Sequence, residues 1–388
     1  MFAPLEAPMK DFAWGSIGAI SAFRGQVLSS AIEAEQWFGG HPRSGTTIFQ
    51  GARETDFSGW LDETGIEFPL LTKVLAAVQP LSIQVHPSEK QAKEGFAAEE
   101  KRVPLQVSEL RNYSDAFAKP ELIICLSPQF RALVGFITAG MLARRLLRWE
   151  KAGLDVSALH IVKRLLDLPL REGVEWALSG DSDVLQCVAG LSAWSFADLD
   201  PSMNGEVRDE HHVMSTLAAA HPGDPGILFG LLMHHISLAQ GEALFVDAGV
   251  VHAYLDGMGL EVMLPSDNVV RAGLTTKYSD RDEFLSVASL EPISSPPFVV
   301  PQDHGDSLLY SDFPAGFRVY RLSQGAGLSL IDSHAIVFSD GARGKVSGAE
   351  SSLDVTPGQV FFATASEAEL RFEGAGALWI VCPEGKQP

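Results

Sequence analysis

A hydroxyl, an amide and an imidazole alternate with aliphatic side chains in residues 80–87, as Ser82, Gln84 and His86. A β-strand points successive side chains to opposite faces, so a strand here would place these three polar groups on one face. Imidazole nitrogens and amide oxygens bind metal ions, and hydroxyl groups bind polar ligands. The pattern indicates a polar cavity or a metal site, and the alternative is an ordinary sheet with one solvent-facing side.

A second stretch has the same alternation of polar and apolar side chains. Lys119 and Glu121 lie two residues apart at the start of a run that alternates with apolar residues as far as Leu126. Either charge alone would be typical of an exposed strand edge. Two strands with the same kind of polar face favour a shared polar interior.

A third stretch, residues 241–252, has a glycine turn, an apolar strand, a second turn and then His252. This order resembles the second conserved motif of the cupin superfamily, with Asp247 where proline is usual. Residues 357–364 repeat the glycine-and-strand half, but no histidine follows. The later copy therefore resembles a second barrel without a metal site.

These stretches together predict one metal site with four ligands, namely Gln84, His86, Glu121 and His252. Two imidazoles, a carboxylate and an amide oxygen suit Zn²⁺, with Mn²⁺, Fe²⁺ and Co²⁺ as alternatives. Their separation in the sequence requires a barrel that brings three strands together. Other histidines are weaker candidates. His234 and His235 are neighbours that would face opposite sides of a strand. Three lie in a region with helical pattern, namely His160, His211 and His212, and two lack polar company, namely His304 and His334.

The composition limits the class of partner. The chain has 388 residues and a formal net charge of -20, which argues against nucleic acid and anionic membranes as partners. It has three scattered cysteines, no signal-peptide pattern and no apolar run of the roughly 20 residues that a membrane span needs. We expect a cytoplasmic protein without disulfides.

Residues 138–222 differ in pattern from the rest of the chain. Apolar residues recur at helical spacing in 141–149 and 159–166, and residues 211–221 suggest another helix. The basic residues between them are expected on solvated helix faces. The region is predicted to be a helical insert.

The predicted fold is mainly β with that helical insert and two cupin-type β-barrels, or jelly rolls. Residues 1–137 and 223–290 are expected to form the catalytic barrel. Residues 291–388 are expected to form a degenerate barrel, joined to the first by the Pro-rich stretch 291–301.

The motifs so far resemble the type I mannose-6-phosphate isomerase family over nearly the whole chain. The most specific runs are Ser-Ile-Gln-Val-His-Pro, at residues 82–87, and Ser-Asp-Asn-Val-Val-Arg-Ala-Gly-Leu-Thr-Thr-Lys, at residues 266–277. Further matching segments are residues 14–16, 35–44, 68–75, 119–121 and 252–255. Thr276 departs from the pattern, because proline is common there.

The resemblance implies an enzyme that interconverts mannose 6-phosphate and fructose 6-phosphate with one Zn²⁺ per chain, bound by the four ligands named above. It implies catalytic roles for Arg271, Lys119 and Asp267. It also implies substrate binding by Ser82, Trp14 and Lys277. We expect a monomer with a sugar phosphate as its partner. The direction of flux, toward GDP-mannose precursors or mannose catabolism, is left open.

Such an isomerase moves a proton between C2 and C1 of an open-chain sugar, so it must stabilise an enediolate. Positive charge from the metal, Arg271 and Lys119 suits that task. The base stays open between Asp267, the Lys119–Glu121 group and water at the metal. Other roles are also open: Arg271 can instead form a buried ion pair with Asp267, Trp14 can serve packing, and Lys73 is either a buried strand lysine or functional.

Two other functions compete. A cupin oxygenase with Fe²⁺ is disfavoured by the Gln-x-His pair and by the segment around Arg271. A non-catalytic sugar-phosphate-binding cupin would require a damaged site, whereas every residue expected to be essential is present.

Overall fold

Two large antiparallel sheets carry most of the strands in the computed structural model, which describes residues 1–102, 110–330 and 333–384. Each sheet has eleven strands. The prediction of a mainly β fold with helices in the middle of the chain is confirmed. Within the described residues, no helix is long and apolar enough to cross a membrane.

The first sheet, here called the site sheet, holds the residues predicted to bind metal. Its main path is β16 (Phe298–Val299), β13 (Ala243–Val246), β10 (Glu121–Cys125), β14 (His252–Met263), β8 (Leu71–Ala77), β5 (Glu35–Gly39) and β2 (Met9–Lys10). Four further strands join it, namely β9 (Ile83–Val85), β11 (Gln129–Phe136), β12 (Met233–Ala239) and β15 (Val270–Gly273).

Strand β14 is the centre of the site sheet, because it bends and each of its two halves pairs with two other strands. Its first half pairs with β11 and β9, and its second half pairs with β8 and β10. The change of partner begins around Gly257, which has φ +110°. A Cβ there would lie 2.6 Å from the carbonyl oxygen of Gln129, so only glycine fits this bend.

The second sheet, here called the C-terminal sheet, includes the first strand of the chain. Its path is β17 (Gln302–His304), β18 (Ser307–Tyr310), β19 (Phe317–Ser323), β24 (Glu369–Pro383), β21 (Ala335–Ser347), β23 (Val360–Ala363), β1 (Phe2–Glu6), β6 (Thr47–Gln50) and β7 (Arg53–Asp56). Two strands, β20 (Gly327–Ser329) and β22 (Ser352–Val355), pair at its side. A separate two-stranded sheet consists of β3 (Ser16–Ile17) and β4 (Ile32–Glu33).

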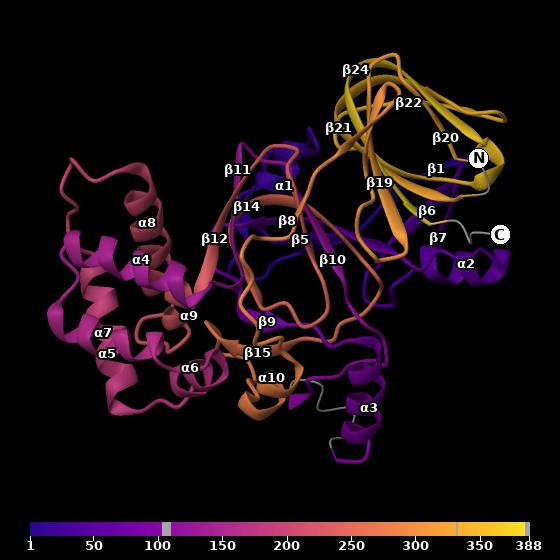
Figure 1. Cartoon of the computed structure of the whole chain (residues 1–388). Coiled ribbons are helices and arrows are strands. Elements are labelled where there is room, and N and C mark those ends of the chain that lie inside the picture. The colour runs from indigo at the N-terminus through magenta and orange to yellow at the C-terminus, as the bar shows by residue number, and fades with distance from the viewer. Residues whose placement is uncertain (103–109, 331–332, 385–388) are drawn as a thin grey trace.

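The position of β1, β6 and β7 differs from the sequence-based expectation, which assigned all of residues 1–137 to the catalytic barrel. Figure 1 shows these indigo strands beside the yellow C-terminal ones. Strand β1 pairs with β23 from Phe2 opposite Ala363 to Leu5 opposite Val360. Alternation predicts the faces of a strand but not its distant pairing partner, so the sequence pattern could not place β1.

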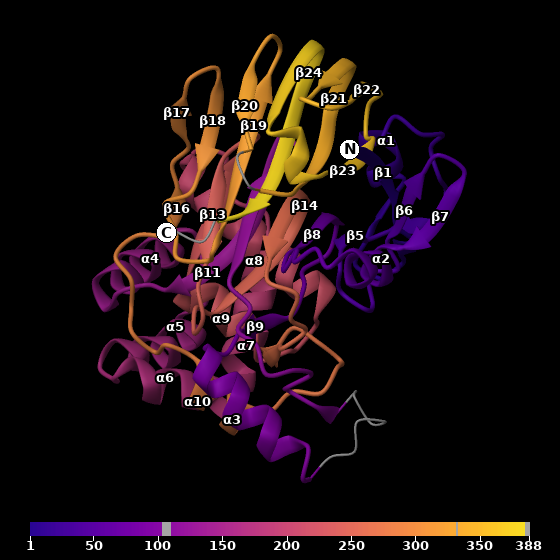
Figure 2. The ribbon, with the colours of Figure 1, turned by 90° about the vertical axis from the view of Figure 1, so that its right-hand side faces the viewer.

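An apolar core joins the two sheets. Phe38 of the site sheet meets Phe338 of the C-terminal sheet with ring centroids 5.3 Å apart. Phe68 meets Phe362 in the same edge-to-face manner at 5.3 Å. All four rings are buried, and Figure 2 shows the two sheets in contact along this region. The sheets therefore stabilise each other by burying apolar surface.

Many of the helices lie in the predicted insert. Those within residues 138–222 are α4 (Ala139–Lys151), α5 (Val156–Lys163), α6 (Leu170–Ala177), α7 (Ser182–Ser195) and α8 (Gly205–Ala220), with a 3-10 turn η2 (Arg164–Leu166). Helix α9 (Ile227–Leu232) follows the insert. Figure 1 shows α4 to α8 together on the side of the site sheet opposite the C-terminal sheet. The remaining helices are α1 (Ala19–Phe23), α2 (Phe57–Thr64), α3 (Glu89–Glu99), α10 (Arg281–Val287) and the 3-10 turn η3 (Ala365–Glu367).

Residues 223–290 are expected to supply strands of the catalytic barrel, but their first regular element is the helix α9. All six residues of α9 are buried. A short continuous apolar run is compatible with either a buried strand or a buried helix, so periodicity alone could not decide here.

A buried charge network ties the insert to the site sheet. Glu210 of α8 accepts hydrogen bonds from Arg145 Nε at 3.0 Å and Trp149 Nε1 at 2.7 Å, and also pairs with Arg148. Arg145 Nη1 donates to the carbonyl oxygen of Met233 at 2.8 Å, where β12 begins. The expectation that the basic residues of the insert are solvated is therefore wrong for Arg145, which is buried.

Replacing Glu210 with Ala leaves the buried guanidinium of Arg145 without its carboxylate. We expect the free energy of unfolding to fall by about 3–5 kcal/mol, because an uncompensated buried charge is strongly destabilising. Urea unfolding, followed by the fluorescence of the stacked pair Trp149 and Trp194, measures the change. Glu206→Ala is the control: that side chain is 60% exposed and also pairs with Arg148, so its loss should change stability by about 1 kcal/mol or less. Equal effects of the two substitutions would contradict the assignment.

Candidate metal centre

Three strands of the site sheet bring the four predicted ligands together. Gln84 lies in β9 and His86 follows that strand directly. Glu121 opens β10, and His252 opens β14. His252 is the cross-strand neighbour of Gln84, so their side chains share one face of the sheet.

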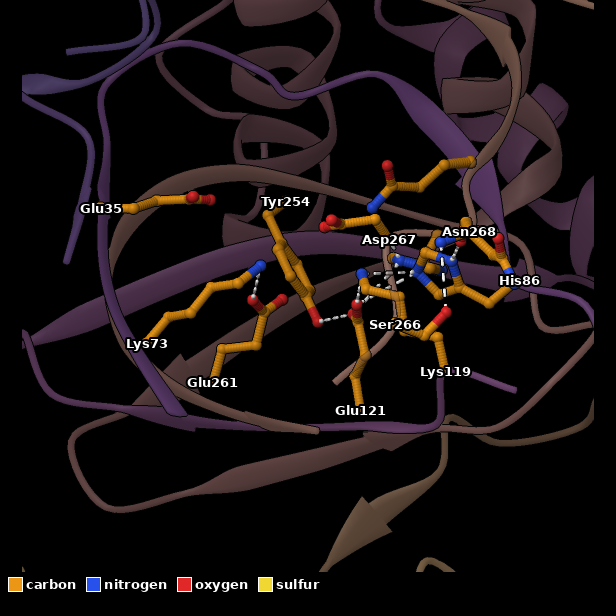
Figure 3. A network of polar contacts seen from close by, with 12 residues as sticks. Glu35, Lys73, His86, Lys119, Glu121, Tyr254, Glu261, Ser266, Asp267 and Asn268 are labelled. Carbon is orange, nitrogen blue, oxygen red and sulfur yellow. Dashed lines mark hydrogen bonds and ion pairs between the residues drawn. The ribbon is translucent and has the colours of Figure 1, made fainter. Parts of the chain in front are cut away.

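Two imidazoles converge on one carboxylate. His86 Nε2 lies 3.1 Å from Glu121 Oε1, and His252 Nε2 lies 3.6 Å from Glu121 Oε2. One ligand atom from each of the three residues falls within 4.8 Å of the others, and all three side chains are fully buried. Figure 3 shows His86 and Glu121 pointing toward each other. Within the described part of the chain, no other group of three or more potential ligands meets these criteria.

The hydrogen bonds of the two rings direct bare nitrogens at Glu121. His86 Nδ1 donates to the carbonyl oxygen of Asn268 at 2.7 Å, and His252 Nδ1 donates to that of Val250 at 3.0 Å. A carbonyl can only accept, so each neutral ring carries its proton on Nδ1 and has a lone pair on Nε2. These lone pairs face carboxylate oxygens, and a cation between them resolves the repulsion. The residues therefore fit a metal ion, with a backbone carbonyl orienting each imidazole.

The pKa values agree with this charge distribution. Burial lowers the pKa of His252 to about 4, so the ring is neutral near pH 7. Burial and the nearby Lys119 ammonium lower the pKa of His86 as well. Burial alone would raise the pKa of Glu121, but Lys119 and His86 outweigh it and hold that pKa well below its usual value.

The fourth predicted ligand, Gln84, also reaches the centre. Its amide nitrogen lies 3.1 Å from His252 Nε2. A half turn about the last side-chain bond exchanges the amide nitrogen and oxygen, and the oxygen is the atom that binds a metal. The structure thus brings together all four side chains named from the sequence.

Two further side chains hold the carboxylate of Glu121. Lys119 Nζ donates to Oε1 and lies 3.5 Å from His86 Nε2. The buried Tyr254 hydroxyl donates to Oε2 at 3.1 Å. Both contacts hold the carboxylate in place, and Figure 3 shows Lys119 and Tyr254 pointing toward Glu121.

Asn268, whose carbonyl orients His86, is itself clamped. Its side-chain amide donates to the carbonyl oxygens of Asp115 and Phe117 at 2.9 and 2.8 Å, and its oxygen accepts from the backbone N–H of Ser114 at 2.7 Å. The side chain is fully buried. Reasoning from the sequence missed this residue, because its partners lie about 150 positions away.

A cavity of about 380 Å³ lies beside the metal centre. The predicted site residues that line it are Trp14, Ser82, Gln84, Lys119, Asp267, Arg271 and Lys277. Trp14 stacks on Phe12 at its wall, with ring centroids 5.7 Å apart. The predicted ligands His86, Glu121 and His252 lie deeper and have no exposed side-chain surface.

Two cations in the cavity have no carboxylate partner. Arg271 lies opposite Gln84 across the β15–β9 pair, and in the described residues no carboxylate lies within 4 Å of its guanidinium or of Lys277 Nζ. Burial lowers the pKa of Arg271. Burial and the charge of Arg271 lower the pKa of Lys277. This part of the cavity is therefore suited to an anion.

Asp267 pairs with other residues than the sequence suggested. His41 Nε2 and Arg43 Nε lie 3.1 and 3.3 Å from its carboxylate. Burial would raise the pKa of Asp267, but these two partners outweigh it and lower that pKa to about 2. The alternative of a buried ion pair between Arg271 and Asp267 is wrong, because the carboxylate is engaged elsewhere.

The cavity also contains a buried pair that was not predicted as a pair. Lys73 Nζ lies 3.1 Å from Glu261 Oε2 and 4.7 Å from the ring centroid of Trp37. Burial alone would lower the pKa of Lys73, but Glu261 and Glu35 raise it above its ordinary value. The sequence pattern indicates Lys73 as a possible functional residue. It could also have indicated Glu261, which is a single acidic residue between the apolar Leu260 and Val262 of one strand.

The fold and this site define a mainly β protein with a buried metal centre beside an anion-binding cavity. Residues 2–138 match the family model described as phosphomannose isomerase type I, catalytic domain. Mannose-6-phosphate isomerase of Shigella flexneri is 31% identical over 391 residues, covering 95% of this chain and 96% of that protein. The human mannose-6-phosphate isomerase is 28% identical over 323 residues, covering 75% of this chain and 74% of the human protein. The chain belongs to the type I phosphomannose isomerase family.

Solved structures agree with this membership. A zinc-bound crystal structure of mannose 6-phosphate isomerase has a TM-score of 0.86 and 29% identity, covering 99% of this chain and 100% of that one. A mutant phosphomannose isomerase from Salmonella typhimurium has a TM-score of 0.87 with the same identity and coverage. The family resemblance inferred from the motifs is confirmed.

The geometry predicts that His252 is needed for metal retention. We expect His252→Ala to lower the metal content after dialysis to below about a tenth of the wild-type value, because the centre loses a ligand in a fully buried site. Elemental analysis of the purified protein measures this. His160→Ala, which changes an exposed histidine of the insert, serves as the control and should leave the content unchanged. A stoichiometric metal content in His252→Ala would remove His252 from the ligand set.

Proposed function

We propose that this protein is a zinc-dependent aldose–ketose isomerase that interconverts D-mannose 6-phosphate and D-fructose 6-phosphate. The observation that carries the proposal is the buried cluster of His86, Glu121 and His252 beside a cavity with two unpaired cations. The zinc bound in a family structure and the names of the relatives support it.

One Zn²⁺ would be held by Gln84, His86, Glu121 and His252. Two imidazoles, a carboxylate and an amide oxygen are donors that zinc accepts in a tetrahedral arrangement. When bound, the ion supplies Lewis-acid polarisation of a sugar oxygen. Tyr254 and Lys119 hold Glu121 in place for this role.

The reaction moves a proton between C2 and C1 of the open-chain sugar through an enediolate. The barrier is the low acidity of a C–H beside a carbonyl, so positive charge near the developing oxyanion accelerates the step. Lys119 provides such a charge next to the metal ligands, and Arg271 provides one beside Gln84. We assign both residues to stabilising the enediolate.

Asp267 takes a different part in the proposal. A carboxylate with a pKa of about 2 is a weak base, and its oxygen is already paired with His41 and Arg43. We assign Asp267 to orienting these two residues at the cavity wall.

The cavity beside the metal centre binds the phosphate and the carbon chain of the substrate in this proposal. Arg271 and Lys277 pair with the phosphate, and Ser82 donates a hydrogen bond to it. Trp14, stacked on Phe12, contacts the sugar carbons. Arg271 thereby lies between the reacting carbons and the phosphate.

The architecture that we propose has a catalytic cupin-type barrel and a degenerate second one, with residues 138–222 as a helical insert. The bend of β14 and its pairing with four neighbours support the first barrel. The second barrel takes its strands from residues 291–388, except β16, which pairs in the site sheet, and it includes β1, β6 and β7. The monomeric state and cytoplasmic location stay predictions from the sequence.

Removal of the metal tests the proposed function directly. We expect the purified protein to convert mannose 6-phosphate, to retain less than about 1% of its rate after chelation, and to recover on addition of Zn²⁺. Added phosphoglucose isomerase and a glucose-6-phosphate dehydrogenase report the product. Authentic fructose 6-phosphate in the same chelator controls for the coupling enzymes. Full turnover by metal-free protein would refute the metal dependence.

Arg271→Ala separates catalysis from metal binding. We expect kcat to fall by about a hundredfold or more, because the variant loses charge stabilisation in the transition state. The metal content should stay unchanged, since Arg271 is not a ligand. Arg164→Ala, at a side chain that is 54% exposed, is the matched control and should keep the full rate. A near-normal kcat in Arg271→Ala would exclude the proposed role.

A further inference from the structure

The helical insert contributes one residue to the cavity wall among the residues that the structure describes. This residue is His221, directly after α8. Its backbone is fixed, because its N–H donates to the carbonyl oxygen of Leu217 at 2.9 Å and its own carbonyl accepts from Asp224 at 3.2 Å. Its imidazole is half-buried and has no hydrogen bond or ion pair to the described chain. The side chain is thus held at the cavity by its backbone and is free to bind.

The turn that carries His221 packs against the segment that carries Arg271. A Cβ on Gly273 would lie 3.0 Å from Cα of Gly226, and one on Gly226 would lie 2.9 Å from the backbone nitrogen of Leu274. Two backbones in such close contact need glycine on both sides. Leu274, with φ +53°, redirects the chain there toward Lys277. The contact therefore sets the position of His221 relative to β15.

The carboxylates of the cavity already have partners. Asp267 pairs with His41 and Arg43, and Glu261 pairs with Lys73. Next to the turn, Asp224 accepts a hydrogen bond from the backbone N–H of Gly226 at 2.7 Å.

Several nitrogen-bearing side chains of the cavity have no hydrogen-bond acceptor in the described residues, and His221, Arg271 and Lys277 are among them. A phosphate presents several acceptor oxygens, and donors on different elements satisfy it well.

We propose that His221 is a phosphate-binding residue of the cavity, whose imidazole N–H donates to a phosphoryl oxygen beside Arg271 and Lys277. This inference rests on the proposed function, because it assigns the substrate's phosphate to that wall. His221 would make the insert part of the substrate site and add to the preference for phosphorylated over free sugar. A hydrogen bond to a charged acceptor corresponds to about tenfold in affinity.

Two substitutions of His221 separate the contribution of its N–H donor to phosphate binding from the contribution of the ring's shape. His221→Phe keeps a planar ring without a donor, and His221→Gln keeps a donor without the ring. We expect His221→Phe to raise KM for mannose 6-phosphate about tenfold with kcat within about twofold, and His221→Gln to restore most of the loss. Calorimetric titration with inorganic phosphate should show a parallel rise in Kd. His212→Phe, at an exposed histidine of the same helix, is the control.

Each outcome decides the proposal. An unchanged KM and phosphate Kd in His221→Phe would overturn it while leaving the isomerase function intact. Equal impairment in the Phe and Gln variants would also overturn it, because packing and not the donor would then matter. If the wild-type protein binds phosphate in a His221-dependent way but does not isomerise mannose 6-phosphate, the proposed function fails and the phosphate site stands.

Discussion

The rest of the site depends on one electrostatic constraint. Two neutral imidazoles present their Nε2 lone pairs to the carboxylate of Glu121 in a fully buried space. Such a group is unfavourable without positive charge, because side chains buried from bulk solvent are poorly screened from one another. A metal ion satisfies all of them at once. Neighbouring groups maintain this arrangement. The backbone carbonyls of Asn268 and Val250 set the tautomers of the two imidazoles, and the Tyr254 hydroxyl orients the carboxylate.

The short strand β9 links this centre to the anion-binding end of the cavity. Gln84 has His252 as its neighbour on one side and Arg271 on the other. Cross-strand neighbours share a face of the sheet. The predicted ligand His252 and the proposed catalytic residue Arg271 are therefore each held one strand spacing, about 5 Å, from Gln84. A substrate that reaches Arg271 is therefore also near the metal. Strands position these groups more rigidly than loops would, which suits a reaction that needs exact placement.

Elements remote from the centre serve this geometry. The bend of β14 at Gly257 lets one strand contact β9, β10 and β11, so that ligands far apart in the sequence meet. The C-terminal sheet covers the opposite face of the site sheet through rings such as Phe38 and Phe338. The insert is anchored by the buried pair of Arg145 and Glu210, and its last helix leads into His221. The helices thus contribute support and, as we propose, one direct contact.

The sequence by itself was enough to name the candidate metal ligands, since alternation in a strand is a local property. Gln84 and His86 share a face because they are two residues apart, and the motif at His252 and the lone Glu121 completed the set. The tertiary structure alone decided which charges pair. Asp267 binds His41 and Arg43 and not Arg271, and β1 lies in the C-terminal sheet. These outcomes depend on contacts between distant segments, which a period of two or 3.6 residues does not encode.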